Sequence, residues 1–219
     1  MIQALILGSG GHAKVVIEIF QENADINIVG LIDKDPASIG KQVLGVPVIG
    51  TDEELTRFYE SGIHHAIVAV GGTGDNFLRF KLFDRLKEIG FQFVNAIHPR
   101  AIISKTAVLG SGDTVMAGSI INAGTVIGAN AIINSGSIIE HDCRIGAHVH
   151  IAPRTAIAGG VTVGELTHVG MGAVVIQGRI IGNNVLIGAG AVIIKDVPDN
   201  AVVVGNPGRV IRYRELPKG

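Results

Sequence analysis

Residues 121–145 read INAGTVIGANAIINSGSIIEHDCRI and repeat one pattern every six positions. An aliphatic residue returns at a fixed phase, and glycines or other small residues often stand beside it. Followed in both directions, this phase has sixteen members without interruption, so the period is structural rather than accidental. The members are Ile103, Leu109, Val115, Ile121, Ile127, Ile133, Ile139, Ile145, Ile151, Ile157, Val163, Val169, Val175, Ile181, Ile187 and Ile193.

The six-residue period excludes a helix and indicates short strands. On an α-helix, positions six apart point about 240° away from each other, so they cannot share a face. β-Branched residues at a fixed phase, often followed by glycine, favour a short strand and then a tight corner. Flat sides joined by corners form coils that stack about 4.8 Å apart through parallel backbone hydrogen bonds. The sequence therefore predicts a parallel β-helix with the aliphatic phase inside.

Before residue 96 the pattern changes to that of an α/β domain. Three apolar segments, Ala4–Leu7, Ile28–Ile32 and Ala66–Val70, have the composition of buried strands. A capping box over residues 51–54 indicates the start of one helix. Two further helices are indicated by apolar residues at helical spacing, and the second of them is expected to end at Gly90. The apolar residues are Val15, Val16, Ile19 and Phe20 in the first helix and Leu78, Leu82, Leu86 and Ile89 in the second. This β-α-β-α-β order predicts a Rossmann-like half domain at residues 1–95. A β-helix domain with a C-terminal tail would occupy residues 96–219.

The first predicted strand leads into Gly8-Ser9-Gly10-Gly11-His12-Ala13, which matches the G-x-G-x-x-A nucleotide fingerprint. Asp33 ends the second strand twenty residues after Ala13, where the fingerprint has an acid for a ribose hydroxyl. About 95 residues supply one mononucleotide half, so we expect one nucleotide, for example the UDP of a nucleotide sugar. The residues expected to bind it are Gly10, Gly11, His12, Asp33 and Lys34. In the alternative interpretation, the glycines serve only a tight turn and close packing.

Composition excludes several classes of protein. The chain of 219 residues has a net charge of −1, which gives no basic surface for nucleic acid or an anionic membrane. Residues 1–20 have no basic segment, and glycines interrupt their apolar run, so neither a signal peptide nor a membrane span is expected. The single cysteine, Cys143, fits a reducing compartment. We therefore expect a cytoplasmic protein.

The most reactive group of side chains lies on the predicted β-helix. His141 stands in Glu140-His141-Asp142 directly after the core residue Ile139, so its ring leaves the coil at a corner. A histidine flanked by carboxylates suits a general base, because the carboxylate fixes its tautomer and raises its basicity. His150 follows nine residues later, and His168 lies three periods beyond His150.

Four motifs, in this order, resemble one family: Gly8-Ser9-Gly10-Gly11-His12, Asn95-Ala96-Ile97-His98, the segment 139–146 around His141, and Val204-Gly205-Asn206-Pro207. This is the bacterial sugar O-/N-acyltransferase family of hexapeptide-repeat proteins. It includes sialic acid O-acetyltransferases and nucleotide-amino-sugar N-acetyltransferases. The resemblance covers essentially the full length and implies a left-handed β-helix with triangular coils of three hexads. Residues eighteen apart would then stack, as His150 and His168 would.

The resemblance also implies roles for individual residues. His141 would be the general base, and Asp142 would raise its basicity. The backbone amide of Gly159 would lie near the oxygen of the acetyl-CoA thioester, where a developing oxyanion needs a donor. Acetyl-CoA, the co-substrate, would also contact His150 and a groove lined by Met171 and Ala189. No metal would be required.

A homotrimer with active sites between neighbouring β-helices is also implied by the resemblance. Apolar residues just before the core phase agree with burial between subunits, because such a stripe would be costly in water. They are Val108, Ile120, Val126, Ile132, Ile138, Val174 and Ile180. The expected partners are therefore further copies of the chain and a sugar or nucleotide-sugar substrate.

We predict an acetyl-CoA-dependent acetyltransferase that acts on the amino group of a nucleotide-linked amino sugar, of the UDP-4-amino-4,6-dideoxy-sugar type. O-Acetylation of sialic acid or another surface-polysaccharide sugar is the first alternative. A zinc-dependent β-helix enzyme needs histidines 36 residues apart, but the positions 36 beyond His141, His148 and His150 are occupied by Gln177, Asn184 and Leu186. A nicotinamide-binding or regulatory module and a non-catalytic β-helix are the remaining alternatives.

Overall fold

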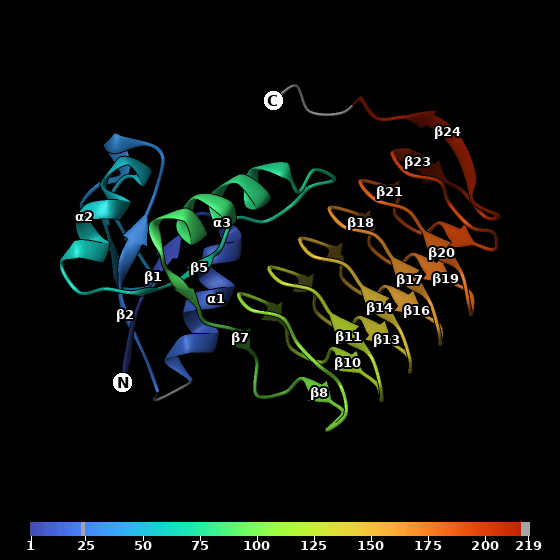
Figure 1. Cartoon of the computed structure of the whole chain (residues 1–219), viewed down its shortest axis with the longest axis horizontal. Helices are drawn as coiled ribbons and strands as arrows, with labels where there is room; N and C mark the ends of the chain where they lie inside the picture. The colour runs from blue at the N-terminus through green and yellow to red at the C-terminus, as the bar shows by residue number, and fades with distance from the viewer. Residues whose placement is uncertain (23–24, 216–219) are drawn as a thin grey trace.

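A computed structural model describes residues 1–22 and 25–215 of the chain, so the last four residues of the expected range 96–219 lie outside the described part. An α/β domain packs against one side of a β-helix (Figure 1). Its elements are β1 (Ile2–Leu7), α1 (Gly11–Gln21), β2 (Ile26–Ile32), η1 (Pro36–Ser38), β3 (Gln42–Val43), β4 (Val46–Gly50), η2 (Asp52–Glu54), α2 (Leu55–Glu60), β5 (His65–Val68), α3 (Phe77–Ile89) and β6 (Gln92–Phe93).

The sheet of the α/β domain has the strand order β3-β4-β2-β1-β5-β6. All of its pairs are parallel except β3 with β4. The predicted β-α-β-α-β order is correct but incomplete, because β3, β4 and β6 were not expected from the sequence. β3 and β6 have two residues each, and β4 contains Pro47, so none of them carries a clear alternating pattern.

Side chains of β1 alternate between two cores, which explains why helices cover both faces of the sheet. Ala4 and Ile6 pack with residues of α1, whereas Leu5 and Leu7 pack with residues of α2 and α3. The predicted end of the last helix is confirmed, because Gly90 caps α3 in the left-handed conformation with φ 110°.

Three faces make up the β-helix, and each is named here after one strand of a single coil. The β15 face contains β7 (Ala96–Ile97), β9 (Thr114–Val115), β12 (Ile132–Ile133), β15 (His150–Ile151), β18 (His168–Val169), β21 (Leu186–Ile187), β23 (Ala201–Val204) and β24 (Arg209–Tyr213). The β13 face contains β8 (Ile102–Ile103), β10 (Ile120–Ile121), β13 (Ile138–Ile139), β16 (Ala156–Ile157), β19 (Val174–Val175) and β22 (Val192–Ile193). The β14 face contains β11 (Val126–Ile127), β14 (Arg144–Ile145), β17 (Thr162–Val163) and β20 (Ile180–Ile181).

Stacking follows the predicted interval of eighteen residues. Ile121 pairs with Ile139, Ile139 pairs with Ile157, and His150 pairs with His168. From Val115 onward the sixteen-member phase is buried in one core. Full burial of such a side chain is worth roughly 1.5–3 kcal/mol, so the repeat supplies most of the driving force for this half of the chain.

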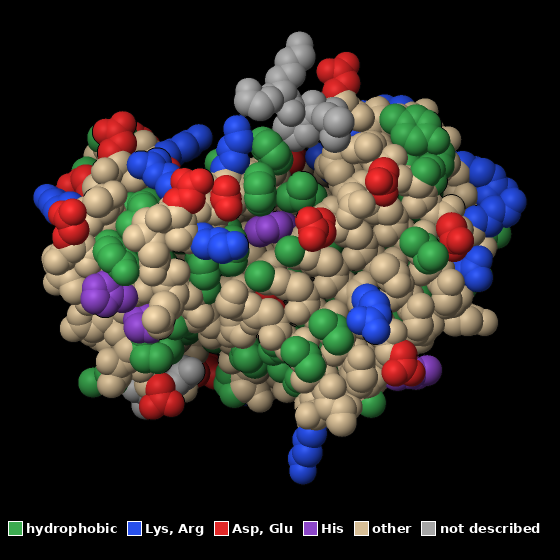
Figure 2. All heavy atoms as spheres, viewed as in Figure 1, with side chains coloured by type: hydrophobic (Ala, Val, Ile, Leu, Met, Phe, Trp, Pro, Cys, Tyr) green, Lys and Arg blue, Asp and Glu red, His purple; other side chains and the backbone are tan. Residues whose placement is uncertain are grey.

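The α/β domain covers the β15 face, and this corrects one expectation. Ile132 was expected in an apolar stripe buried between subunits, but the covering domain already buries it fully within one chain. On the other two faces, the apolar stripe is exposed at Val108, Val126, Ile138, Val174 and Ile180. Figure 2 shows apolar side chains on the β-helix surface between isolated charged ones.

Candidate active site

A cavity of about 650 Å³ lies where the α/β domain meets the β-helix. One wall is the predicted nucleotide loop with Asp33, Lys34 and Asp52, and the other wall comes from the β-helix. The β-helix contributes Met116, Asn134, Ser135 and His150. A volume of this order suits a small organic ligand.

Gly10 and Gly11 line the cavity. Gly10 caps α1, which begins at Gly11, and a β-carbon at either glycine would meet no atom within 4 Å. The N–H groups at the start of a helix are free to bind an anion, and the helix dipole favours negative charge there. His12 follows, and burial, with the nearby Arg79, lowers its pKa to about 4. It is therefore neutral at pH 7 and can offer a ligand a hydrogen bond but no positive charge.

Asp33 is held in the loop by two hydrogen bonds. The Ser9 hydroxyl donates to Oδ2, and the backbone N–H of Asp35 donates to Oδ1 over 3.0 Å. Partial burial raises the pKa of Asp33, but these bonds outweigh it and keep the pKa below its usual value. The carboxylate is thus ionised and fixed beside the glycine loop, and Lys34, the next residue, also lines the cavity.

The corner between the β13 and β14 faces carries His141. Its Nδ1 lies 2.9 Å from Oδ2 of Asp142, and both side chains are exposed. A β-carbon on Gly159, in the next coil, would lie 2.7 Å from Nε2 of His141. The structure therefore brings together His141, Asp142 and Gly159, with the Nε2 side of the ring over the glycine.

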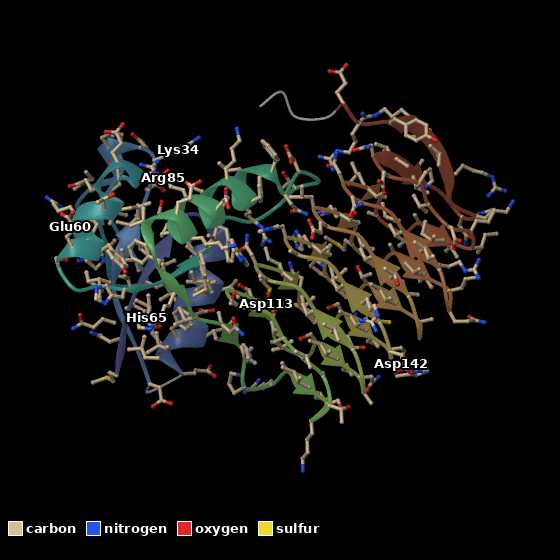
Figure 3. All side chains as sticks on the ribbon, viewed as in Figure 1. Lys34, Glu60, His65, Arg85, Asp113 and Asp142 are labelled. Carbon is tan, nitrogen blue, oxygen red and sulfur yellow. The ribbon has the colours of Figure 1, made fainter. Side chains whose placement is uncertain are left out.

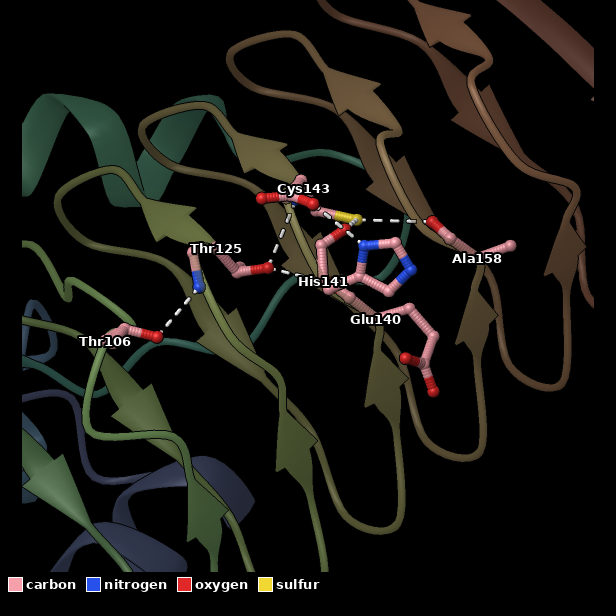
Figure 4. A network of polar contacts seen from close by, with 8 residues as sticks. Thr106, Thr125, Glu140, His141, Cys143 and Ala158 are labelled. Atoms are coloured by element: carbon pink, nitrogen blue, oxygen red, sulfur yellow. Dashed lines mark hydrogen bonds and ion pairs between the residues drawn. The ribbon is translucent and has the colours of Figure 1, made fainter.

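Thr125 fixes this corner from the coil before it. Its hydroxyl donates to the carbonyl of Glu140 over 2.7 Å and accepts from the N–H of Cys143 over 3.2 Å (Figure 4). These two groups flank His141 on either side. The thiol of Cys143 donates to the carbonyl of Ala158 over 3.2 Å, which agrees with a structural role for this cysteine.

His150 lies in the cavity wall and not at the corner of His141. Its Nδ1 faces the carbonyl of Gly72 at 3.0 Å, and its Nε2 lies 3.1 Å from Nδ2 of Asn134. Nδ1 therefore carries the proton and Nε2 accepts from the amide. Burial, together with the neighbouring His168, lowers the pKa of His150 to about 3.

Met171 and Ala189 stack on the corner between the β15 and β13 faces. The N–H of Gly190 donates to the carbonyl of Met171 over 2.8 Å, and the Met171 side chain is exposed. Asn134 and Ser135 of the cavity belong to the same column of corners, two coils earlier. A groove along this column would thus run away from the cavity.

Within one chain, the cavity and His141 are not brought together. The cavity lies beside the β15 face, whereas the corner of His141 joins the other two faces and is opposite to it. Figure 3 shows the labelled Asp142 on the side of the β-helix away from the α/β domain. Asp52, Asn134 and Gly72 were not predicted as site residues. Asp52 belongs to the capping box recognised at residues 51–54, but that motif indicates the start of a helix and not a ligand site. Its place beside Asp33 depends on β4, which the sequence did not reveal.

Comparisons with known proteins identify relatives of both halves of the chain. Residues 3–86 match the PglD N-terminal domain, and residues 124–159 match the bacterial transferase hexapeptide (six repeats). A perosamine N-acetyltransferase from Caulobacter crescentus, solved as a mutant, is 45% identical, with a TM-score of 0.89 over 95% of this chain and 96% of that one. The acetyltransferase domain of PglB from Neisseria gonorrhoeae is 34% identical, with a TM-score of 0.88 over 96% of this chain and 100% of that one.

The chain belongs to the bacterial sugar acyltransferase family. The predicted family and the left-handed sense of the β-helix are thereby confirmed. A UDP-N-acetylbacillosamine N-acetyltransferase from Bacillus subtilis is 39% identical over 120 residues, which are 53% of this chain and 52% of that protein. The alignment thus spans about half of the length of this relative.

Two further observations concern the described residues alone. No three of their His, Cys, Asp or Glu side chains converge as a group that could hold a metal ion. None of the helices in residues 1–22 and 25–215 is long and apolar enough to cross a membrane.

Proposed function

We propose that the protein is an acetyl-CoA-dependent N-acetyltransferase of a nucleotide-linked amino sugar. The observation that carries this proposal is the cavity, which joins an anion-binding loop at residues 8–12 to the corner column of a β-helix. The Caulobacter relative was solved with CoA and GDP-perosamine, and the Neisseria relative with acetyl coenzyme A. Residues 1–95 would bind the nucleotide sugar, and residues 96–219 would bind acetyl-CoA.

His141 is the proposed general base. Its Nδ1–H donates to Asp142, which leaves Nε2 free to accept a proton. As the amine of the sugar attacks the thioester carbon, Nε2 removes a proton from the nitrogen. The N–H of Gly159 donates to the oxygen that becomes negative. When the C–S bond breaks, the imidazolium returns the proton to the CoA sulfur, so an amide and free CoA thiol leave.

Support for this assignment comes from geometry and from the relatives. Asp142 holds the ring in one tautomer, and Gly159 lies directly under it. Two of the Caulobacter structures, both with CoA and GDP-perosamine, are of mutants in which one histidine is replaced by alanine or asparagine.

The active site is proposed to form between copies of the chain in a homotrimer. A triangular coil keeps the corner of His141 opposite the face that the α/β domain covers. The cavity of one copy must therefore meet His141 of another copy. Exposed apolar side chains on the β13 and β14 faces, such as Val174 and Ile180, support burial of these faces between subunits.

Acetyl-CoA would lie along the column of Met171 and Ala189. Met171 offers an exposed apolar side chain to the pantetheine arm. Contact of His150 with acetyl-CoA stays a prediction, and its place in the cavity wall supports contact near the reacting end. We place the reaction in the cytoplasm, where acetyl-CoA and nucleotide sugars are made.

Release of CoA thiol from acetyl-CoA tests the proposal directly. The full chain should release thiol with nucleotide-linked 4-amino-4,6-dideoxy sugars and not with free sialic acid. His141→Ala should lower kcat by about 10²–10⁴ while acetyl-CoA binding is retained. Thiol release with sialic acid alone would instead favour O-acetylation, and an unchanged rate in His141→Ala would remove the histidine from the mechanism.

A further inference from the structure

Asp52 places a carboxylate in the cavity that the reaction described above does not use. It is the first residue of η2, directly after β4 and Thr51, and it lines the cavity with Asp33 and Lys34. Among the described residues, no hydrogen-bond donor contacts its carboxylate. Burial raises the pKa of Asp52, and the nearby Arg85 opposes this shift. Figure 3 shows Lys34 and Arg85 at this end of the domain.

The strand order determines which part of a nucleotide reaches Asp52. β1, β2 and β4 are neighbours in the sheet, and their carboxyl ends lead to the glycine loop, Asp33 and Asp52 in turn. The N–H of Asp33 donates to the carbonyl of Gly50 over 3.2 Å, so the ends of β2 and β4 are joined. Neighbouring strands are about 4.8 Å apart, which puts the end of β4 about 10 Å from the loop.

This spacing matches the order of groups in a nucleoside diphosphate. With the diphosphate at the N-terminus of α1, the ribose lies beside Asp33 and the base extends to Asp52. Leu78 and Leu82 of α3 supply apolar surface to the same cavity. A planar base can pack against such surface while its edge meets the carboxylate.

The chemistry of a carboxylate selects among the bases. An ionised carboxylate only accepts hydrogen bonds, and its two oxygens match two adjacent donors. Guanine offers N1–H and the N2 amino group side by side. Uracil and thymine offer one N3–H between two carbonyl oxygens, which would repel the carboxylate. Adenine offers an amino group beside a ring nitrogen that accepts.

We infer that Asp52 recognises the guanine base, and that the amino sugar acceptor is linked to guanosine diphosphate. This inference rests on the proposed function and identifies its nucleotide. It differs from the UDP linkage that the glycine loop alone suggested, because the loop binds the diphosphate, which all such substrates share.

Calorimetric titration of the full chain with GDP, UDP, dTDP and ADP tests the inference. GDP should bind at least about tenfold more tightly than the other three nucleotides, since a bidentate hydrogen-bonded contact with the edge of a base is worth about 1–3 kcal/mol. Asp52→Asn should weaken the binding of GDP by about the same factor. The amide has only one acceptor, and its N–H donor would face a donor of guanine. UDP binding should be retained or improved, since an amide complements N3–H and O4 of uracil. The control Glu53→Gln, an exposed neighbour, should leave all four affinities unchanged.

Either of two binding results would overturn the inference. Wild-type protein that binds UDP as tightly as GDP would show that the base is not selected here. Equal weakening of all four nucleotides in Asp52→Asn would assign the carboxylate to the ribose or to the loop. The thiol-release assay distinguishes failure of this inference from failure of the proposed function. Acetylation of amino sugars irrespective of the base would refute the role of Asp52 alone. Selective GDP binding without acetylation of any nucleotide-linked amino sugar would refute the proposed function.

Discussion

The imidazole of His141 lies over Gly159, so close that a β-carbon on the glycine would come within 2.7 Å of Nε2. These residues belong to consecutive coils and are eighteen positions apart. Gly159 has no positive φ, so the requirement for glycine comes from the ring above it and not from its own backbone.

Gly159→Ala should therefore impair catalysis with little effect on folding. The methyl group must displace the ring, and a shift of about 1 Å in a reacting group costs about 100-fold in rate. We expect kcat of thiol release to fall by about this factor while the thermal unfolding midpoint changes little. Gln177→Ala, at the same corner position in the next coil, is the matched control and should retain wild-type kcat. Normal activity in Gly159→Ala would show that the ring position is not critical.

Thr125→Val should loosen the corner of His141. The variant keeps the shape of the side chain but leaves the carbonyl of Glu140 and the N–H of Cys143 without their partner. A lost buried hydrogen bond costs about 1–3 kcal/mol, which urea denaturation would detect. Because both groups flank His141, kcat should also fall, with KM for the nucleotide sugar unchanged. Thr162→Val, on the outer side of β17, controls for the loss of a hydroxyl.

Acid should destabilise the fold through histidines at the contact between the domains. Burial is the largest cause that lowers the pKa of His12, His148 and His168 to about 4 and of His150 to about 3. Each is neutral in the folded state, whereas in the unfolded state it takes up a proton below about pH 6.5. The free energy of unfolding should therefore be highest above pH 6.5 and fall as the pH decreases towards 4.

One carboxyl group opposes this trend. Burial raises the pKa of Asp113 to about 7, so its contribution to stability increases as the pH falls from about 7 to 4. Four histidines outweigh one aspartate, and urea midpoints at pH 7.5, 6.0 and 5.0 should decrease in that order. His168→Gln should flatten the decrease. A midpoint that is constant or rises towards pH 5.0 would contradict the neutral histidines.

Mixing two inactive variants should restore activity if the site forms between chains. Gly11→Glu places a negative charge where the diphosphate binds, and the space beside Gly11 is open, so the fold is retained. His141→Ala removes the base. In co-assembled trimers of equal parts, about a quarter of the sites combine an intact cavity with an intact histidine. Activity near a quarter of wild type supports shared sites, and a mixture as inactive as each variant alone would place the whole site within one chain.

The regular parts of the fold could be predicted because their information is local. The sixteen-member aliphatic phase specifies the inside of every coil. The stacking interval of eighteen, which the family resemblance implied, was confirmed by pairs such as Ile121 with Ile139. The glycine loop after β1 was recognisable because a phosphate-binding turn needs its residues in sequence. Short strands such as β3 and β6 were missed, since two residues contain no period.

By itself, the sequence determined the two halves, the core of the β-helix, the glycine loop and the corner of His141. The tertiary structure decided which face of the β-helix the α/β domain covers, and with it the cavity. That choice buries Ile132, brings Gly72 to His150 across 78 positions of sequence, and completes the cavity that Asp52 lines. The physical reason is that such contacts depend on the complementarity of two finished surfaces, which no residue pattern along either segment encodes.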